Sequence, residues 1–509
     1  MSNFQLPGRA VPVWIATTPE TNFEPLSGKL STDVAVIGGG IVGITTALFL
    51  KQAGARIALI EAGRVSKGVS GHTTAKITSL HTLIYDHLIT HFGAERARQY
   101  ADSNQAAIDR VESLVTEHSI SCDFSRKPFT TYAQTDAVLR KVEAEMKAVT
   151  ELGLPATFAM AAEMPFSTLG AVTFTNQAQF HPRKYLLALA DLVDGDGSRI
   201  FEMTRALDIE EGNPCRVTTS KGEVTARNVV IATNFPIHDR PGFYFARLSP
   251  TRSYVLAARI RQPFPDAMFV SAEEEGYSFR AQPAEGGEII IVGGGHHKTG
   301  HGGDTVQQYS ALEEYVRKVY DSPKIEYRWS TQDTVTIDHV PYIGRSTSGS
   351  RHIFLATGFA QWGMSSGTLA GMILSDLIQG RGNPWAPVYD PTRFKADTSA
   401  AKQLISANLE VAKDFMSGLF GRPAARLDDV RPGEAGVVSD DGKTGVYRDE
   451  QGNIHAVDPK CTHLGCIVRW NNAEHSWDCP CHGSRFQPSG EIIHAPAVRD
   501  LPRKETGSR

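Results

Sequence analysis

The sequence lacks the features of membrane-spanning, secreted and nucleic-acid-binding proteins. No apolar run is long enough to span a bilayer, and the start of the chain lacks the basic segment and apolar core of a secretion signal. Lysine and arginine total 52 against 56 acidic residues, so there is no excess of positive charge to attract nucleic acid or an anionic membrane surface. We therefore expect a cytoplasmic protein with no membrane span and no nucleic-acid partner.

Cysteine is also scarce, and its distribution is uneven. Two of the six cysteines, Cys122 and Cys215, stand alone without a neighbour that would activate a thiol, so we expect them to be small buried apolar residues. The other four fall within residues 461–481. In a chain without a secretion signal, such clustering indicates a metal site before a disulfide framework.

A dinucleotide-binding pattern occupies residues 33–61. A short apolar strand is followed by G-x-G-x-x-G at Gly38, Gly40 and Gly43, then by an apolar-periodic helix and a second strand that ends at Glu61. The glycines permit a tight turn, close approach of a pyrophosphate, and helix–strand packing. Glu61 follows at roughly the 20-residue spacing of an acid that binds a ribose hydroxyl. The pattern predicts a dinucleotide site, with FAD and NAD(P) both possible.

A second glycine-rich run, residues 286–300, looks similar but does not complete the fingerprint. Lys298 stands at the third glycine position, and no apolar helix follows. One dinucleotide site is therefore expected. An enzyme that passes electrons from NAD(P)H to bound FAD would ordinarily show two.

The length and strand pattern predict more than one domain. A chain of 509 residues exceeds what one core usually supports. Strand-like runs at residues 172–180 and 252–261 indicate an antiparallel-sheet substrate subdomain, interleaved with an α/β Rossmann-type nucleotide-binding domain. A buried strand within residues 226–236 ends in a small-residue turn at Ala232 and Thr233, and residues 352–378 repeat the order strand, glycine turn, helix.

GGGIVG, VVIAT, the Asp338-x-x-Pro341 turn and ATGFAQWGM occur in that order. With them, residues 10–385 resemble the flavin-dependent amine and amino-acid oxidase family that includes D-amino acid oxidase, sarcosine oxidase and glycine oxidase. The resemblance implies FAD rather than NAD, and it implies an FAD-dependent domain over residues 1–395. The residues that it places at the cofactor are Gly38, Gly39, Gly40, Gly43, Glu61, His72, Thr73, Thr74, Ala232, Thr233, Gly358, Phe359, Gly363 and Met364.

His72 leaves two possibilities open. Some relatives attach FAD covalently through a histidine in the loop after the ribose acid, and His72 lies in the equivalent loop, SGHTTA. The tryptophan that often precedes that histidine is absent. A hydrogen-bonded loop histidine is the alternative.

The C-terminal part changes character. Residues 396–425 are expected to be a linker that contains a helix from about residue 399 to 420, and residues 426–509 are expected to form a small all-β domain. There, Cys461-x-His463 and Cys479-x-x-His482 offer two thiolates and two imidazoles, the ligands of a Rieske [2Fe–2S] cluster. A zinc site is the alternative, but the two glycine-bearing loops and the HGS sequence favour the cluster.

CTHLGC and CPCHGS are also similar to the high-potential Rieske proteins of respiratory and photosynthetic cytochrome complexes. That resemblance implies a disulfide between Cys466 and Cys481, which ties the two ligand loops together. Two free thiols are the alternative, because cytoplasmic disulfides are unusual.

Together the resemblances imply a dehydrogenase with electron flow from a small amine or amino acid to FAD, then to the Rieske cluster and an external protein acceptor. The candidate catalytic residues are Arg252, Tyr254, Lys298 and Trp362. Arg252 suits a substrate carboxylate through bidentate pairing, although it could equally be a surface arginine. Trp362 would line the flavin, and Lys298 would lie over the flavin or at the substrate. Two other classes stay open: a reductase with the reverse electron flow, and a Rieske oxygenase.

Overall fold

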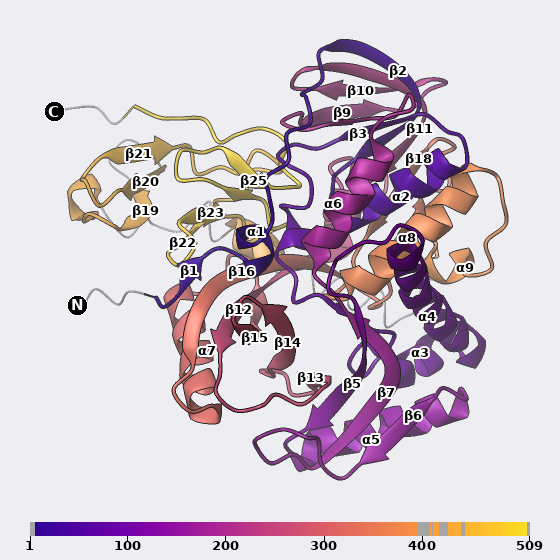
Figure 1. Ribbon diagram of the computed structural model, residues 1–509. Coiled ribbons are helices and arrows are strands. Elements are labelled where there is room, and N and C mark those ends of the chain that lie inside the picture. Colours follow the sequence, from indigo (N-terminus) through magenta and orange to yellow (C-terminus); the bar gives the residue numbers. More distant parts are fainter. Residues whose placement is uncertain (1–5, 394–407, 410, 417–425, 439–442, 506–509) are drawn as a thin grey trace.

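The computed structural model describes residues 6–393, 408–409, 411–416, 426–438 and 443–505. Two large sheets form most of the molecule, and a small C-terminal domain of short strands lies against them (Figure 1). Among the helices of these residues, none combines the length and apolarity needed to cross a membrane.

The first sheet is 8-stranded in the described part of the chain and has a parallel centre. β2 (Gly28–Ile37) lies between β11 (Gly222–Ile231) and β3 (Ile57–Ile60), and both neighbours run parallel to it. The C-terminal parts of these strands are buried and apolar, as is required of parallel strands that are covered on both faces. The remaining strands are β8 (Arg199–Phe201), β9 (Ala206–Glu210), β10 (Cys215–Thr219), β17 (Tyr342–Arg345) and β18 (Ile353–Thr357).

Helices α2 (Ile41–Gln52), α6 (Pro182–Val193) and α8 (Gly363–Ile378) lie side by side along this sheet (Figure 1). Small residues allow α2 and α8 to pack closely. A methyl group at Gly371 would lie 2.7 Å from Cγ2 of Thr45, so the two helices can meet here only because that position has no side chain.

The second sheet has 10 strands among the described residues and is largely antiparallel. β12 (Leu248–Arg259) pairs with β15 (Gly287–Lys298) on one side and with β16 (Lys324–Thr336) on the other. α7 (Thr305–Val319) packs against β12 and β15. The other strands are β1 (Arg9–Ala10), β4 (Lys76–Ile77), β5 (Ser125–Ala133), β6 (Ala156–Ala159), β7 (Gly170–Gln179), β13 (Met268–Ser271) and β14 (Ser278–Ala284).

The chain passes between the two sheets several times, which confirms the expected Rossmann-type domain with an interleaved antiparallel-sheet subdomain. The second glycine-rich run forms part of β15 and not a nucleotide-binding turn. The remaining helices are α1 (Val13–Ala16), α3 (Tyr85–Phe92), α4 (Ala94–Glu117), α5 (Asp136–Glu151) and α9 (Ala386–Tyr389), with 3-10 turns at η1 (Val69–Gly71), η2 (Tyr244–Ala246) and η3 (Leu427–Asp429).

Where the structure describes it, the C-terminal domain forms two small antiparallel sheets, which confirms the expected all-β class. Residues 411–416 are helical, and most of the helix expected over residues 399–420 lies outside the described residues. The strands are β19 (Ala435–Val438), β20 (Thr444–Arg448), β21 (Ile454–Val457), β22 (Arg469–Asn471), β23 (Ser476–Asp478), β24 (Arg485–Phe486) and β25 (Ile492–His494).

Candidate flavin and iron–sulfur sites

A large cavity lies where the carboxyl ends of β2, β3 and β11 face the second sheet. The nucleotide-binding glycines line one end of it, and residues of β12, β14, β15 and β16 line another. The expected cofactor residues on its wall are Gly38, Gly39, Gly40, Glu61, Thr73, Thr74, Ala232, Thr233, Phe359, Gly363 and Met364.

The glycine turn has no room for side chains. Gly38 has a φ of +110°, and a Cβ there would lie 2.4 Å from the carbonyl oxygen of Ala232. A Cβ at Gly43 would lie 1.9 Å from the carbonyl oxygen of Gly38, so Gly43 permits helix–strand packing and does not itself line the cavity. This open backbone cradle fits the pyrophosphate of a dinucleotide.

Glu61 ends β3 as expected for the acid that binds ribose. Its carboxylate accepts hydrogen bonds from the N–H groups of Gly39 (2.7 Å) and Gly63 (2.8 Å), which fix its direction at the cavity wall. Burial raises the pKa of this carboxyl group. Two backbone contacts leave further lone pairs for a ribose hydroxyl.

Besides Gly43, two of the expected cofactor residues do not reach the cavity wall. Gly358 has a φ of +80° and supports the turn before α8, because a Cβ there would lie 2.3 Å from Cγ2 of Thr336. His72 points Nδ1 back to the carbonyl oxygen of Gly68 (2.9 Å). That contact agrees with a hydrogen-bonded loop histidine and does not favour a covalent link to flavin.

Arg252 and Tyr254 lie on the face of β12 that points away from the cavity. Side chains alternate along a strand, and the cavity is lined by Ser253 and Val255 instead. Arg252 is fully buried, with its guanidinium 3.7 Å from the carboxylate of Glu474 in the C-terminal domain. The structure therefore does not bring Arg252 or Tyr254 to the cavity where we expected them to contact substrate.

Lys298 and Trp362 also lie off the cavity wall. Nζ of Lys298 is 3.4 Å from Oδ2 of Asp414, so its position does not support a role over the flavin. Trp362 precedes α8 and stacks on His81, with ring centroids 5.0 Å apart. Trp362 supports the loop that carries Phe359 and Gly363 and does not face the cavity.

Several cavity residues were missed by sequence reasoning. They lie on the inner face of the second sheet, in the loop between β18 and α8, or in the C-terminal domain: Ser253, Val255, Ser278, Gly293, Gly294, His296, Thr331, Asp333, Gln361, Ile493, His494, Ala495, Ala497 and Val498. Strand alternation could have identified Ser253 and Val255, given the correct face. No local signal in the sequence indicates that residues 493–498 form a wall of the cavity.

The four expected cluster ligands converge in the C-terminal domain. The Cys461 and Cys479 thiols hydrogen-bond to each other, which lowers the pKa of Cys461 and raises that of Cys479. The rings of His463 and His482 have centroids 5.0 Å apart. Nδ1 of each ring is buried without a hydrogen-bond partner. Buried polar atoms are rarely left unpaired, so two free imidazole nitrogens beside two thiols fit a metal cluster.

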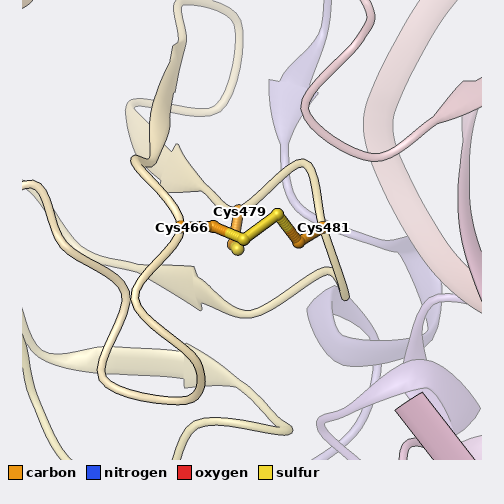
Figure 2. A group of neighbouring side chains, drawn as sticks. All are labelled: Cys466, Cys479 and Cys481. Carbon is orange, nitrogen blue, oxygen red and sulfur yellow. A yellow bond between two sulfur atoms is a disulfide. The ribbon is translucent and has the colours of Figure 1, made fainter. Parts of the chain in front are cut away.

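Burial lowers the pKa of His482 to about 3, which keeps its imidazole neutral, as a metal ligand must be. The Cys466–Cys481 disulfide that the resemblance implied is present and joins the two ligand loops, with Cys479 beside it (Figure 2).

The family comparisons agree with both sites. The family model described as FAD dependent oxidoreductase matches residues 33–377. The chain belongs to this family. A second family model, the Rieske [2Fe-2S] domain, matches residues 422–504. The protein is therefore an FAD-dependent oxidoreductase that carries a Rieske domain, with FAD and a [2Fe–2S] cluster as its cofactors.

Individual relatives and solved structures match the chain over different shares of its length. The chain is 40% identical to the protein YhfW of Bacillus subtilis (strain 168) over 490 residues, 96% of each chain. It is 24% identical to gamma-glutamylputrescine oxidoreductase of Escherichia coli (strain K12), over 70% of this chain and 86% of that protein. The crystal structure of glycine oxidase from Geobacillus kaustophilus superposes with a TM-score of 0.61 at 19% identity, and the match covers 72% of this chain and all of that one.

Proposed function

We propose that this flavoprotein is a dehydrogenase that oxidises a small amine or amino acid to an imine, with FAD accepting a hydride equivalent and the Rieske cluster relaying single electrons to an external acceptor protein. The observation that supports this most directly is the shared cavity. The Rieske domain lines the same cavity as the nucleotide-binding glycines, through Ile493, His494, Ala495, Ala497 and Val498. A Rieske domain in that position suits exchange of electrons within one chain.

The cavity residues suit a neutral amine as the reacting species. Burial lowers the pKa of His296, so this imidazole is neutral near pH 7 and adds no positive charge to the cavity wall. Ser253 and Ser278 add hydroxyls that can orient the amine. Amine oxidation asks the protein mainly to orient substrate and cofactor and to exclude water.

The scarcity of basic side chains on the cavity wall limits the class of substrate that would bind there. Among the described residues that line it, Arg205 is the one lysine or arginine, and its guanidinium donates to the carbonyl oxygen of Ile492 (3.3 Å). Lys76 lies behind the wall, where its Nζ donates to the hydroxyls of Thr74 (3.1 Å) and Ser278 (3.0 Å), so it is not on the cavity surface to pair with a carboxylate. Within the proposed reaction, amines without a carboxylate are the first substrates to test, and N-methyl amino acids are the second.

Anaerobic addition of candidate amines to the protein with both cofactors tests the proposal. We expect an active amine to bleach the flavin absorbance first and then to produce the EPR signal of the reduced cluster. In a Cys461→Ser variant, the flavin should bleach without the EPR signal, because the variant lacks a cluster ligand. Bleaching by NAD(P)H or a reduced ferredoxin, and by no amine, would show instead that electrons enter through the cluster.

The expected cytoplasmic location stays a prediction.

A further inference from the structure

Residues 232–239 connect the two cofactor sites. This segment follows β11, and its first residues, Ala232, Thr233 and Asn234, line the FAD cavity. Phe235 is fully buried, and its ring centroid lies 6.5 Å from those of both His463 and His482. The segment therefore reaches from the cavity wall to the imidazoles of the cluster within a few residues.

Asp239, the last residue of this segment, contacts one cluster ligand directly. Nε2 of His463 donates to Oδ2 of Asp239 across 2.8 Å, and the Asp239 residue is only 4% exposed. No other hydrogen bond or ion pair of this carboxylate occurs within the described residues. The two cluster histidines differ in this respect, because His482 has the aromatic rings of Phe235 and Phe245 as neighbours.

The contact assigns the tautomer of His463. A carboxylate can only accept hydrogen bonds, so the ring proton must reside on Nε2. Nδ1 of His463, which is buried and unpartnered, then carries the free lone pair with which this ring would bind iron. A carboxylate behind a metal-bound histidine fixes the ring and increases its basicity, which enriches the metal in electrons.

We propose that Asp239 is a positioning residue for the Rieske cluster: it orients His463 toward iron and lowers the midpoint potential of the cluster by placing a buried negative charge next to a ligand. Reduction adds an electron to the cluster, and a nearby anion opposes this addition. The inference depends on the cluster alone. It does not depend on the amine substrate or on the direction of electron flow.

An EPR-monitored redox titration with chemical mediators tests the inference on the protein with both cofactors, at one fixed pH. Asp239→Asn keeps the size of the side chain and removes its charge, so we expect a higher midpoint potential than in the wild type. Asp239→Glu keeps the charge, and its midpoint should lie nearer to that of the wild type.

Asp304→Asn is the matched control. Asp304 accepts a hydrogen bond from Asn472 of the Rieske domain (2.6 Å) but contacts no cluster ligand, so its replacement should leave the midpoint unchanged. A midpoint for Asp239→Asn that is equal to or lower than that of the wild type would overturn the proposal.

Asp239→Ser is a second uncharged variant, for use if Asp239→Asn does not retain the cluster. The midpoint potential is measured on whichever of the two retains iron. Loss of iron from both, with iron retained in Asp304→Asn and FAD retained in all variants, would refute the tuning role and leave Asp239 as a structural contact.

Discussion

His81 is a single buried residue, next to the loop before α8, that should make the stability of the protein depend on pH. Its Nδ1 lies 2.6 Å from the hydroxyl of Tyr100, and its ring stacks on Trp362 just before α8. Burial lowers the pKa of His81 from 6.5 to about 3. Between these values, the unfolded chain binds a proton at this residue and the folded protein does not.

We therefore expect His81 to destabilise the protein progressively as the pH falls below about 6.5. The slope of the unfolding free energy against pH should include about 1.4 kcal/mol per pH unit from this residue. His81→Phe should remove that part of the slope, which denaturant titrations at pH values from about 4.5 to 6.5 would measure. His118→Phe, at an exposed histidine, controls for the loss of a histidine as such. Equal slopes in the wild type and His81→Phe would contradict the expectation.

At the scale of elements, the sequence predicted the order of strands, turns and helices well. It predicted less well which face of a strand points into the cavity. The order of strand, glycine turn, helix and Glu61 was correct, because each piece follows from nearby residues. The strand around Arg252 was also correct, yet the expected substrate contacts lie on its other face. Successive side chains of a strand point to opposite faces of the sheet. A shift of one residue therefore places Ser253, and not Arg252, on the face that lines the cavity.

The turn between β22 and β23 in the Rieske domain is the element that Arg252 contacts. Glu474 in this turn accepts a hydrogen bond from the hydroxyl of Tyr309 on α7 (2.8 Å) and pairs with Arg252. Burial opposes ionisation of Glu474, but Arg252 and Arg485 hold its pKa below the usual value. The turn thereby docks the Rieske domain on the second sheet through a charged contact.

Glu474→Gln should weaken this docking, because it removes the anion that forms an ion pair with the fully buried guanidinium of Arg252. We expect the free energy of unfolding to fall by about 2–3 kcal/mol, at or below the low end for a broken buried pair, because the Glu474 side chain is 22% exposed. Hydrogen exchange should increase in β12 and β22 together. The exposed Glu275→Gln is the control. A change in exchange confined to the turn would show that the ion pair does not hold the domains together.

At the scale of the whole molecule, the sequence predicted two cofactor domains but not their arrangement. The ligand spacings of Cys461, His463, Cys479 and His482 are local, and they were sufficient to predict the cluster. The arrangement depends on contacts between distant segments, such as His494 with Asn234 and His463 with Asp239. Such contacts leave no periodicity in the sequence, so the Rieske wall of the FAD cavity could be found only in three dimensions.

This arrangement predicts that the Rieske domain helps to retain FAD. Binding of the cluster contributes to the folding free energy of a small metal domain. Loss of the cluster should therefore loosen residues 493–498 and open one wall of the cavity. Cys461→Ser should therefore release FAD faster than the wild type after dilution, measured by the rise in fluorescence of free FAD. Cys215→Ser removes a buried cysteine far from the cluster ligands in sequence and should release FAD at the wild-type rate. Equal rates in all three proteins would mean that the glycine cradle and Glu61 hold the flavin without the Rieske wall.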